Sequence, residues 1–265
     1  MLSGIIRMST HNETATGVVS DIAALRREVD AVGHPALLMV DGVSSIGSMD
    51  FRMDEWRVDV AITGSQKGFM LPAGLAIVAL SRKARAVEGG MPRCYFDFSE
   101  MARSLERGGY PYTPPVGLLN GLAVSSAMLL DEGLDAVFAR HVRIASGVRA
   151  AVAAWGLPLC AARPSLQSNT VSAIRLPETI DGGALVAHAQ TAYGVAFGAG
   201  LGELAGRAFR IGHLGQLSDV LALAGIATAE MAMIDLGLDI TAGAGVAAAQ
   251  AVYRRGSASR TQEAA

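Results

Sequence analysis

Lys67 is the residue whose neighbours most directly suggest chemistry. It follows the apolar run DVAIT (59–63) and stands among small and apolar residues in GSQKGFML (64–71). Burial among such residues keeps part of a lysine amine unprotonated, and an unprotonated amine can form an imine with a carbonyl compound. The alternative is an ordinary solvated loop lysine. Taken by itself the position favours the solvated lysine, and the nucleophilic amine depends on the residues that accompany it.

Polar side chains follow three predicted strands at the points where the strands end. Thr14 lies in HNETATG and Asp41 begins DGVSS, while Gln66 stands directly before Lys67. Ligands of open α/β sheets bind outside the carboxyl ends of the strands, so these side chains are expected to converge if the strands are neighbours. Taken singly, each is explained better as a turn or cap residue. Taken together, a lysine amine and a carboxylate that can pair with a protonated pyridine nitrogen are what pyridoxal phosphate chemistry requires.

The elements that would position these residues are strands that alternate with helices. A helical pattern at 20–33, with Ser20 as N-cap and Gly33 as its stop, lies between the first two of four apolar runs. The four runs are GIIRM (4–8), ALLMV (36–40), VAIT (60–63) and GLAIVAL (74–80). Nearly continuous apolar strands between helices predict an α/β fold with a mostly parallel sheet that is covered on both faces.

The pattern becomes more helical after about Gly117. The charge-free stretch 110–130 contains several prolines at its start, so we expect a loop followed by a buried helix. The later candidates are a long helix after Leu134, a strand at 170–176, a helix at 181–192, the segment AFRIGHLG and a closing helix at about 218–236.

Together these patterns predict two domains and a tail. Residues 1–132 would form a large α/β domain, and residues 133–252 a smaller α+β domain. Residues 253–265 would be a frayed tail.

Composition excludes several classes of function. A formal charge of −2 over 265 residues provides no basic field for nucleic acid. Cys94 and Cys160 lie far apart without CxxC spacing, which suggests neither a disulfide framework nor a zinc site. The N-terminal residues contain no apolar stretch long enough for a signal peptide. We therefore expect a cytoplasmic protein without metal, nucleic-acid or membrane partners.

Five segments occur in an order and at a spacing that resemble a known family. These segments are HNETATG, LLMVDGVSSIG, DVAITGSQKG, YPYTP and FRIGHLG. From about Ile5 to Val252 the chain resembles the class V, fold-type I aminotransferases, particularly the serine–glyoxylate and alanine–glyoxylate aminotransferases. The resemblance implies part of the fold-type I large domain followed by a small domain. It also implies a homodimer that transfers an amino group between serine or alanine and glyoxylate.

The resemblance assigns a role to each candidate site residue. Lys67 would form the internal aldimine with pyridoxal 5'-phosphate, and Asp41 would pair with the pyridine nitrogen. Val43 would pack on the ring, Thr14 would lie near the ring oxygen, Gln66 would contact the phosphate, and Tyr110 and Thr113 would reach the cofactor phosphate of the other subunit. Arg210 would hold the substrate carboxylate, for which a planar bidentate donor is well suited.

The resemblance also implies that part of the family fold is absent. Complete members carry roughly another third before the first strand, including a glycine-containing loop and a helix N-terminus that bind most of the phosphate. Its loss would expose sheet edges. Two alternatives therefore remain: a truncated, weakly cofactor-binding or inactive remnant, and another class V enzyme such as a lyase or desulfurase. Arg210 favours transamination.

Other conspicuous residues are expected to be structural. His141 lies among arginines in a helical pattern, which predicts a solvated face. His213 follows Arg210 closely and fits a packing role at least as well as a place in the site. The glycine-rich segment 198–206 would lead to Arg210, and the two tryptophans, Trp56 and Trp155, would lie in cores or interfaces.

Overall fold

The computed structural model describes residues 6–87 and 92–263, and it divides into two compact units. Unit 1 comprises the described residues up to His11 together with Ser20–Ile46 and Phe51–Asp131. Unit 2 comprises Asn12–Val19, Gly47–Asp50 and the chain from Glu132 onward. The sequence placed the whole of residues 1–132 in one domain, but the two short segments belong to the second unit.

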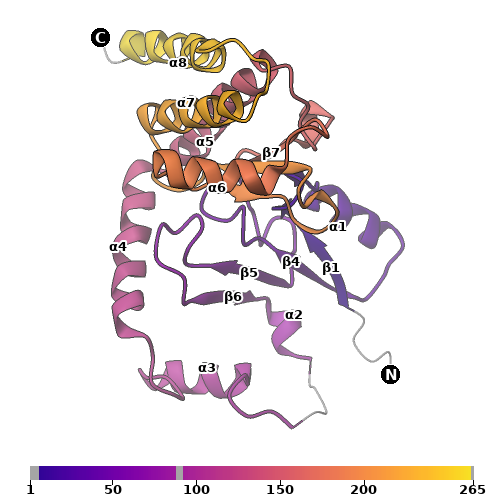
Figure 1. The fold of residues 1–265 in the computed structure, drawn as a ribbon. Helices are drawn as coiled ribbons and strands as arrows, with labels where there is room; N and C mark the ends of the chain where they lie inside the picture. Colours follow the sequence, from indigo (N-terminus) through magenta and orange to yellow (C-terminus); the bar gives the residue numbers. More distant parts are fainter. Residues whose placement is uncertain (1–5, 88–91, 264–265) are drawn as a thin grey trace. The chain divides into compact units, whose positions relative to one another are not determined.

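Unit 1 is built on a four-stranded sheet whose strands lie side by side in the order β1-β4-β5-β6 (Figure 1). The strands are β1 (Ile6–Thr10), β4 (Leu37–Asp41), β5 (Val60–Gly64) and β6 (Ala76–Leu80). The first three are parallel, and β6 runs antiparallel to β5. The predicted α/β class and mostly parallel sheet are thus confirmed, and residues 4 and 5 of the first predicted strand lie outside the described residues.

Helix α1 (Ile22–Ala31) covers part of this sheet. Its N-cap is Asp21, whose carboxylate accepts a hydrogen bond of 2.7 Å from Ala24 N, so the prediction of Ser20 is wrong by one residue. Asp is as good a cap as Ser, so sequence preference alone could not separate the two neighbours. Buried apolar side chains of α1, β4, β5 and the segment before β5 make the core of unit 1: Ile22, Leu38, Val40, Val58 and Ala61.

Three further helices follow β6. They are α2 (Arg82–Arg85), α3 (Phe98–Glu106) and α4 (Val116–Glu132). The predicted helix over the charge-free stretch is present as α4, but it is not buried. Val124 and Leu130 are 63% and 69% exposed, and of its residues only Ser125 and Leu129 are buried. An apolar helix with so much exposed surface is typical of a contact face.

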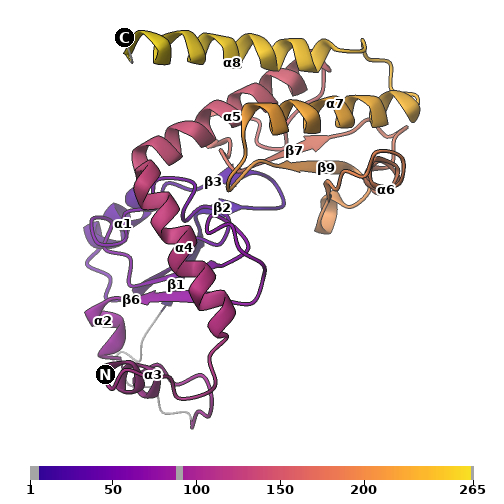
Figure 2. The ribbon, with the colours of Figure 1, turned by 90° about the vertical axis from the view of Figure 1, so that its left-hand side faces the viewer.

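Unit 2 contains a three-stranded antiparallel sheet in the order β7-β9-β8 and a separate β2–β3 hairpin. Its strands are β2 (Asn12–Glu13), β3 (Val18–Val19), β7 (Val171–Arg175), β8 (Gly198–Ala199) and β9 (Ala208–Gly212). Its helices are α5 (Leu134–Ala154), α6 (Gly182–Tyr193), α7 (Asp219–Asp235) and α8 (Ala244–Glu263). Figure 2 shows α5, α7 and α8 packed together beside β7 and β9.

The core of unit 2 lies between these helices and the sheet. It includes Ile144 and Trp155 of the α5 segment, Ile174 and Phe209 of the sheet, and Met233 of α7, all buried. The sequence predicted a frayed tail from residue 253, but α8 continues through this residue to Glu263.

The sequence predicted that His141 lies on a solvated helix face, and this prediction is wrong. It is 1% exposed rather than solvated. Its Nδ1 lies 2.7 Å from Val137 O, and its Nε2 accepts a 3.1 Å hydrogen bond from Gly215 N. Burial lowers the pKa of this imidazole, which favours the neutral ring. The spacing of Val137, His141, Ile144 and Val148 marks one buried helix face, and the neighbouring arginines obscured that signal.

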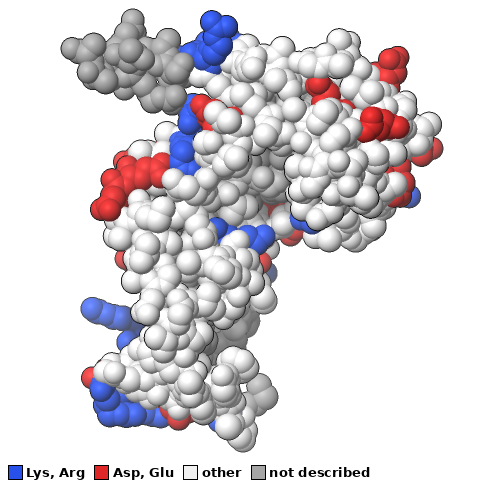
Figure 3. All heavy atoms as spheres, turned by 60° about the vertical axis from the view of Figure 1, so that its left-hand side comes forward, with Lys and Arg blue, Asp and Glu red and all other residues white. Residues whose placement is uncertain are grey.

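Charged side chains of both signs are interspersed on the face drawn in Figure 3. That face presents no continuous basic stripe of the kind that nucleic acid requires. Within the described part of the chain, no helix is both long and apolar enough to cross a membrane.

Candidate active site

Asp41 stands at the carboxyl end of β4, in the middle of the sheet of unit 1. Its backbone oxygen accepts a 2.9 Å hydrogen bond from His11 N, and the next residue continues the pairing with β5 through Gly42 N and Ile62 O, also at 2.9 Å. Its carboxylate accepts a 2.9 Å hydrogen bond from Val43 N and is exposed to solvent. The strand therefore presents an acceptor group at its carboxyl end, with Val43 directly beside it in the loop.

Lys67 lies in the loop that follows β5, the parallel neighbour of β4. The backbone of this loop turns back on itself, with Met70 N donating to Lys67 O at 2.9 Å and Leu71 N donating to Ser65 O at 3.0 Å. Met70 has a φ of 59°, a left-handed conformation that is uncommon for a side chain of this kind. The turn holds Lys67 half-buried at the same edge of the sheet as Asp41.

Ser65 and Gln66 reinforce this loop. The Ser65 hydroxyl donates to Pro72 O at 2.7 Å and accepts from Leu75 N at 3.1 Å, so it closes the base of the loop. The Gln66 side chain folds back over Gly64, where an added Cβ would lie only 2.8 Å from Gln66 Oε1. A glycine at position 64 is therefore required for the observed path of the glutamine side chain.

The candidate residues of unit 2 contact each other directly. Arg210 lies on β9, and its Nη1 donates a 3.1 Å hydrogen bond to Thr14 O in the hairpin turn. Its Nε donates to Ala199 O on β8 at 2.9 Å. The structure thus brings Arg210 and Thr14 together in unit 2, and it brings Asp41 and Lys67 to one edge in unit 1. The expected convergence of Thr14 with the residues of unit 1 stays a prediction.

Tyr110 and Thr113 lie in the loop before α4, and both are exposed. Between them, Tyr112 stacks on Tyr95, with ring centroids 4.4 Å apart and planes inclined by 16°. The Tyr112 hydroxyl also accepts a 3.1 Å hydrogen bond from Tyr95 N. The stacked pair gives this exposed loop a defined anchor.

His11 supports the Asp41 loop and was not identified from the sequence. It is 4% exposed, and its Nδ1 lies 2.9 Å from Ser45 Oγ. Its ring also contacts Phe51 and Trp56, with centroid distances of 5.5 and 5.8 Å. The available signal was its place at the end of the first strand, where an imidazole can bond the loop after the next strand.

His213 is a buried packing residue close in sequence to Arg210. Its Nε2 lies 3.0 Å from Ser172 Oγ, and its Nδ1 lies 3.1 Å from Asn169 O. A carbonyl only accepts, so Nδ1 carries the proton and Nε2 accepts from Ser172. Burial, reinforced by the charge of Arg149, lowers the pKa of His213 to about 3, which keeps the ring neutral.

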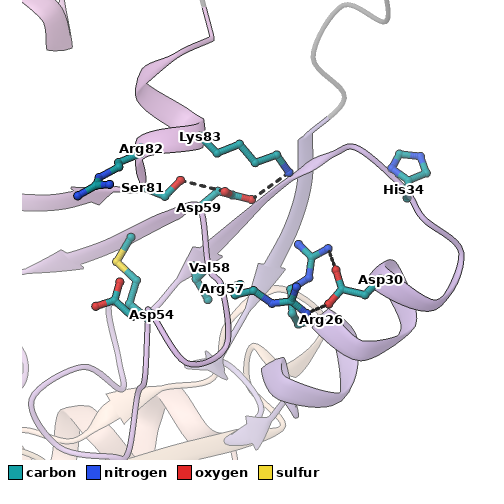
Figure 4. A pocket seen from close by; sticks show the side chains of 11 residues that line it. Arg26, Asp30, His34, Asp54, Arg57, Val58, Asp59, Ser81, Arg82 and Lys83 are labelled. Carbon is teal, nitrogen blue, oxygen red and sulfur yellow. Dashed lines mark hydrogen bonds and ion pairs between the residues drawn. The ribbon is translucent and has the colours of Figure 1, made fainter.

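A cavity of about 510 Å³ lies at the opposite edge of the sheet of unit 1, where Asp59 precedes β5 (Figure 4). Arg26 and Arg57 both form ion pairs with Asp30 there. Lys83 donates to Ala36 O at 2.9 Å and lies 3.6 Å from Asp59 Oδ2. These charges are largely matched within the protein, and the cavity lacks Asp41 and Lys67, so we do not place the active site in it.

Comparison with known proteins gives one consistent result. The family model described as "Aminotransferase class-V" matches residues 6–201. The chain is 66% identical over 260 residues to an L-aspartate–glyoxylate aminotransferase of Paracoccus denitrificans, covering 97% of this chain and 66% of that protein. It is 54% identical over 250 residues to a serine–glyoxylate aminotransferase of Hyphomicrobium methylovorum, covering 93% and 62%.

A solved structure supports the same assignment. Pyridoxamine–pyruvate aminotransferase from Mesorhizobium loti superposes with a TM-score of 0.88 at 35% identity, over 94% of this chain and 64% of that one. The chain therefore spans a little under two thirds of the length of these relatives. Its fold is a partial form of the fold-type I aminotransferase fold, as the sequence predicted. The matched motifs, the extent of the family match and the shared fold show that this chain belongs to the class-V aminotransferases.

Proposed function

We propose that this protein transfers an amino group between a small amino acid and glyoxylate. The observation that carries the proposal is the position of Asp41 and Lys67 on loops that follow adjacent parallel strands, in a chain of the class-V family. The names of its relatives support glyoxylate as the acceptor and give aspartate or serine as the donor. The sequence resemblance suggested serine or alanine, so aspartate is an additional candidate donor.

Membership of this family implies pyridoxal 5'-phosphate as the cofactor, and the residues present fit the ring end of that molecule. Lys67 supplies the amine for covalent attachment, and the solvent-facing carboxylate of Asp41 can accept a hydrogen bond from a protonated pyridine nitrogen. Val43 and Thr14 are assigned to the ring, and Gln66 to the phosphate. When bound, the cofactor accepts the electron pair that is released at the substrate Cα.

The residues of the chain would divide the remaining work between them. Arg210 would bind the substrate carboxylate in both half-reactions, because a guanidinium fork matches a carboxylate bidentately. Lys67 Nζ, once free of the cofactor, would take the proton from the substrate Cα and later return it. Asp41 would keep the pyridine nitrogen protonated, and this charge stabilises the electron pair in the transition state.

The site assignment is tested by chemical trapping, because the chain contains two lysines, Lys67 and Lys83. Borohydride reduction of the complete protein loaded with pyridoxal phosphate, followed by peptide mapping, is expected to place the label on Lys67. Lys83→Arg is the matched control, since this lysine is held by Ala36 O at the opposite edge of the sheet. Label on Lys83, or labelling that survives Lys67→Arg, would contradict the assignment.

The same preparation tests the reaction. Glyoxylate-dependent consumption of serine, alanine and aspartate is followed in parallel. At least one donor is expected to give a kcat of about 10 per second, which is typical of enzymes. A protein that retains labelled cofactor but converts none of the three donors would be another kind of class-V enzyme. Loss of the cofactor on dialysis from the 265-residue chain, prepared in parallel, would show that this chain by itself is the weakly binding remnant.

We further propose a homodimer in which Tyr110 and Thr113 reach the cofactor of the partner subunit. Tyr110 is 50% exposed, and the adjoining α4 presents exposed apolar side chains such as Val124 and Leu130. Mixed dimers of Lys67→Ala and Tyr110→Ala subunits should regain activity, because one of their two sites keeps both wild-type residues. Failure to regain activity, with light scattering showing a dimer, would refute contribution in trans.

A further inference from the structure

The β2–β3 hairpin is fastened to the sheet that carries Arg210. The Asn12 side-chain amide donates a 2.7 Å hydrogen bond to Thr170 Oγ1, a contact between residues 158 positions apart. Ser168 N donates to Gly17 O at 2.9 Å at the other end of the hairpin turn. The turn that contains Thr14 is therefore held on both sides by the segment that leads into β7.

This hairpin in turn helps to orient the guanidinium of Arg210. Two backbone carbonyls, Ala199 O and Thr14 O, accept from its Nε and Nη1. An added Cβ at Gly198 would lie 3.2 Å from Cζ, Nε and Nη2, so β8 passes close to the guanidinium group. Among the described residues, one N–H of Nη1 and both of Nη2 remain available, and these can form the fork for a carboxylate.

The anchor of the hairpin is itself rigid. Thr170 is fully buried, and its Oγ1 also lies 3.1 Å from Ser168 Oγ. Arg149 donates to Ser168 O at 3.0 Å and to Asn169 Oδ1 at 3.3 Å. Asn12 is 2% exposed, so its hydrogen bond to Thr170 is made out of contact with water, where losing a partner is costly.

We infer that Asn12 is a positioning residue for the substrate carboxylate. Its amide fixes the hairpin on Thr170, the fixed hairpin holds the Thr14 carbonyl, and that carbonyl sets the direction of the Arg210 fork. The inference rests on the proposed function, since it takes Arg210 as the group that binds the carboxylate. Loss of the Asn12 amide frees the turn, and the guanidinium then loses one of its two carbonyl supports.

The test uses the complete protein loaded with pyridoxal phosphate and three variants: Asn12→Ala, Thr170→Val and Thr170→Ser. Removing either partner of the Asn12–Thr170 hydrogen bond should raise KM for both the amino donor and glyoxylate about tenfold, with kcat changed less than about twofold. Thr170→Ser keeps the hydroxyl, so its KM values should equal those of the wild type. Binding of glycolate, an unreactive analogue of glyoxylate, measured by calorimetry should weaken by the same factor.

Two controls separate the possible failures. Glu230→Gln perturbs the α7–α8 contact in the same unit and should leave KM unchanged; a similar KM rise there would attribute the effect to general loosening and overturn the inference. Arg210→Lys should raise KM more than Asn12→Ala does. If Arg210→Lys has no effect, the proposed carboxylate site fails. If it raises KM while Asn12→Ala and Thr170→Val do not, the inference alone is overturned.

Discussion

The strand ends of unit 1 and the hairpin region of unit 2 hold their candidate functional groups in different ways. Asp41 is exposed, and its carboxylate is bonded to the backbone of its own loop at Val43. Arg210 is supported by two carbonyls, and one of them belongs to a hairpin that is anchored on buried Thr170. This is the arrangement expected if Asp41 meets an incoming cofactor, as proposed, and Arg210 presents a fixed fork to a substrate carboxylate.

This difference implies different consequences of mutation. Changes at the open strand ends should remove chemistry and leave folding almost intact, because little packing depends on them. Changes in the buried polar groups of unit 2 should lower stability or loosen geometry, because each lost partner leaves a buried donor or acceptor unsatisfied. The following predictions test that division.

Asp41→Asn should give the largest effect, and it should be on catalysis. Asparagine keeps an oxygen for Val43 N but carries no charge to hold a pyridine proton, so kcat of the complete protein should fall at least about a hundredfold, roughly 2.7 kcal/mol in the barrier. The melting temperature should stay near that of the wild type. Asp54→Asn, at the opposite edge of the sheet, serves as the control. A fall of less than about tenfold would contradict the role assigned to Asp41.

Much of unit 1 was predictable from sequence, because its information is local. Each buried strand is a short apolar run, and Asp41 and Lys67 lie at or shortly after the ends of two of them, as Asp41 follows Leu37–Val40. The rule that ligands bind at the carboxyl ends of parallel strands then brought Asp41 and Lys67 to one edge. The antiparallel direction of β6 was not indicated, since an apolar run carries no sign of its direction.

Unit 2 was harder to predict because its organisation depends on contacts distant in sequence. The pairing of Asn12 with Thr170 joins residues from opposite halves of the chain, and no local pattern announces it. The burial of His141 was obscured by arginines on the other faces of α5. The same holds for one contact of unit 1, since His11 and Ser45 meet only after β1 and β4 pair. Hydrophobic periodicity does not indicate which polar residues will contact each other in the folded protein.

Glu230→Ala should give the next largest effect, and it should be on stability. This carboxylate is 4% exposed and accepts from Trp155 Nε1 at 2.8 Å, from Gly245 N at 2.7 Å and from Gly243 N. It therefore joins α5 and α7 to the start of α8, and its removal leaves three donors without their acceptor. We expect a loss of about 2 kcal/mol in the free energy of unfolding, measured with urea.

The contrast between the two units also predicts where Glu230→Ala should have no effect. Trapping of the cofactor on Lys67 should proceed as in the wild type under conditions where the variant is folded, because the attachment loop is held by its own hydrogen bonds. If the free energy of unfolding of Glu230→Ala equals that of the wild type, the buried carboxylate contributes little to stability.

The smallest predicted effect is the contribution of His213 to the pH dependence of stability. Burial lowers its pKa from the ordinary value of 6.5 to about 3, so the unfolded chain binds a proton below pH 6.5 while the folded protein does not. The stability that this neutral histidine contributes is therefore complete above pH 6.5 and is lost as the pH falls towards 3, at about 1.4 kcal/mol per pH unit. Between pH 7.5 and 5.5, His213→Gln should remove about 1.4 kcal/mol of the fall in unfolding free energy, because glutamine does not titrate. Comparing the two proteins cancels the contribution of groups that they share, including His141, whose pKa burial also lowers. If the fall in unfolding free energy between the two pH values is the same in both proteins, water or an acidic partner reaches His213 in the folded protein, and its surroundings are less closed than its contacts with Ser172 and Asn169 indicate.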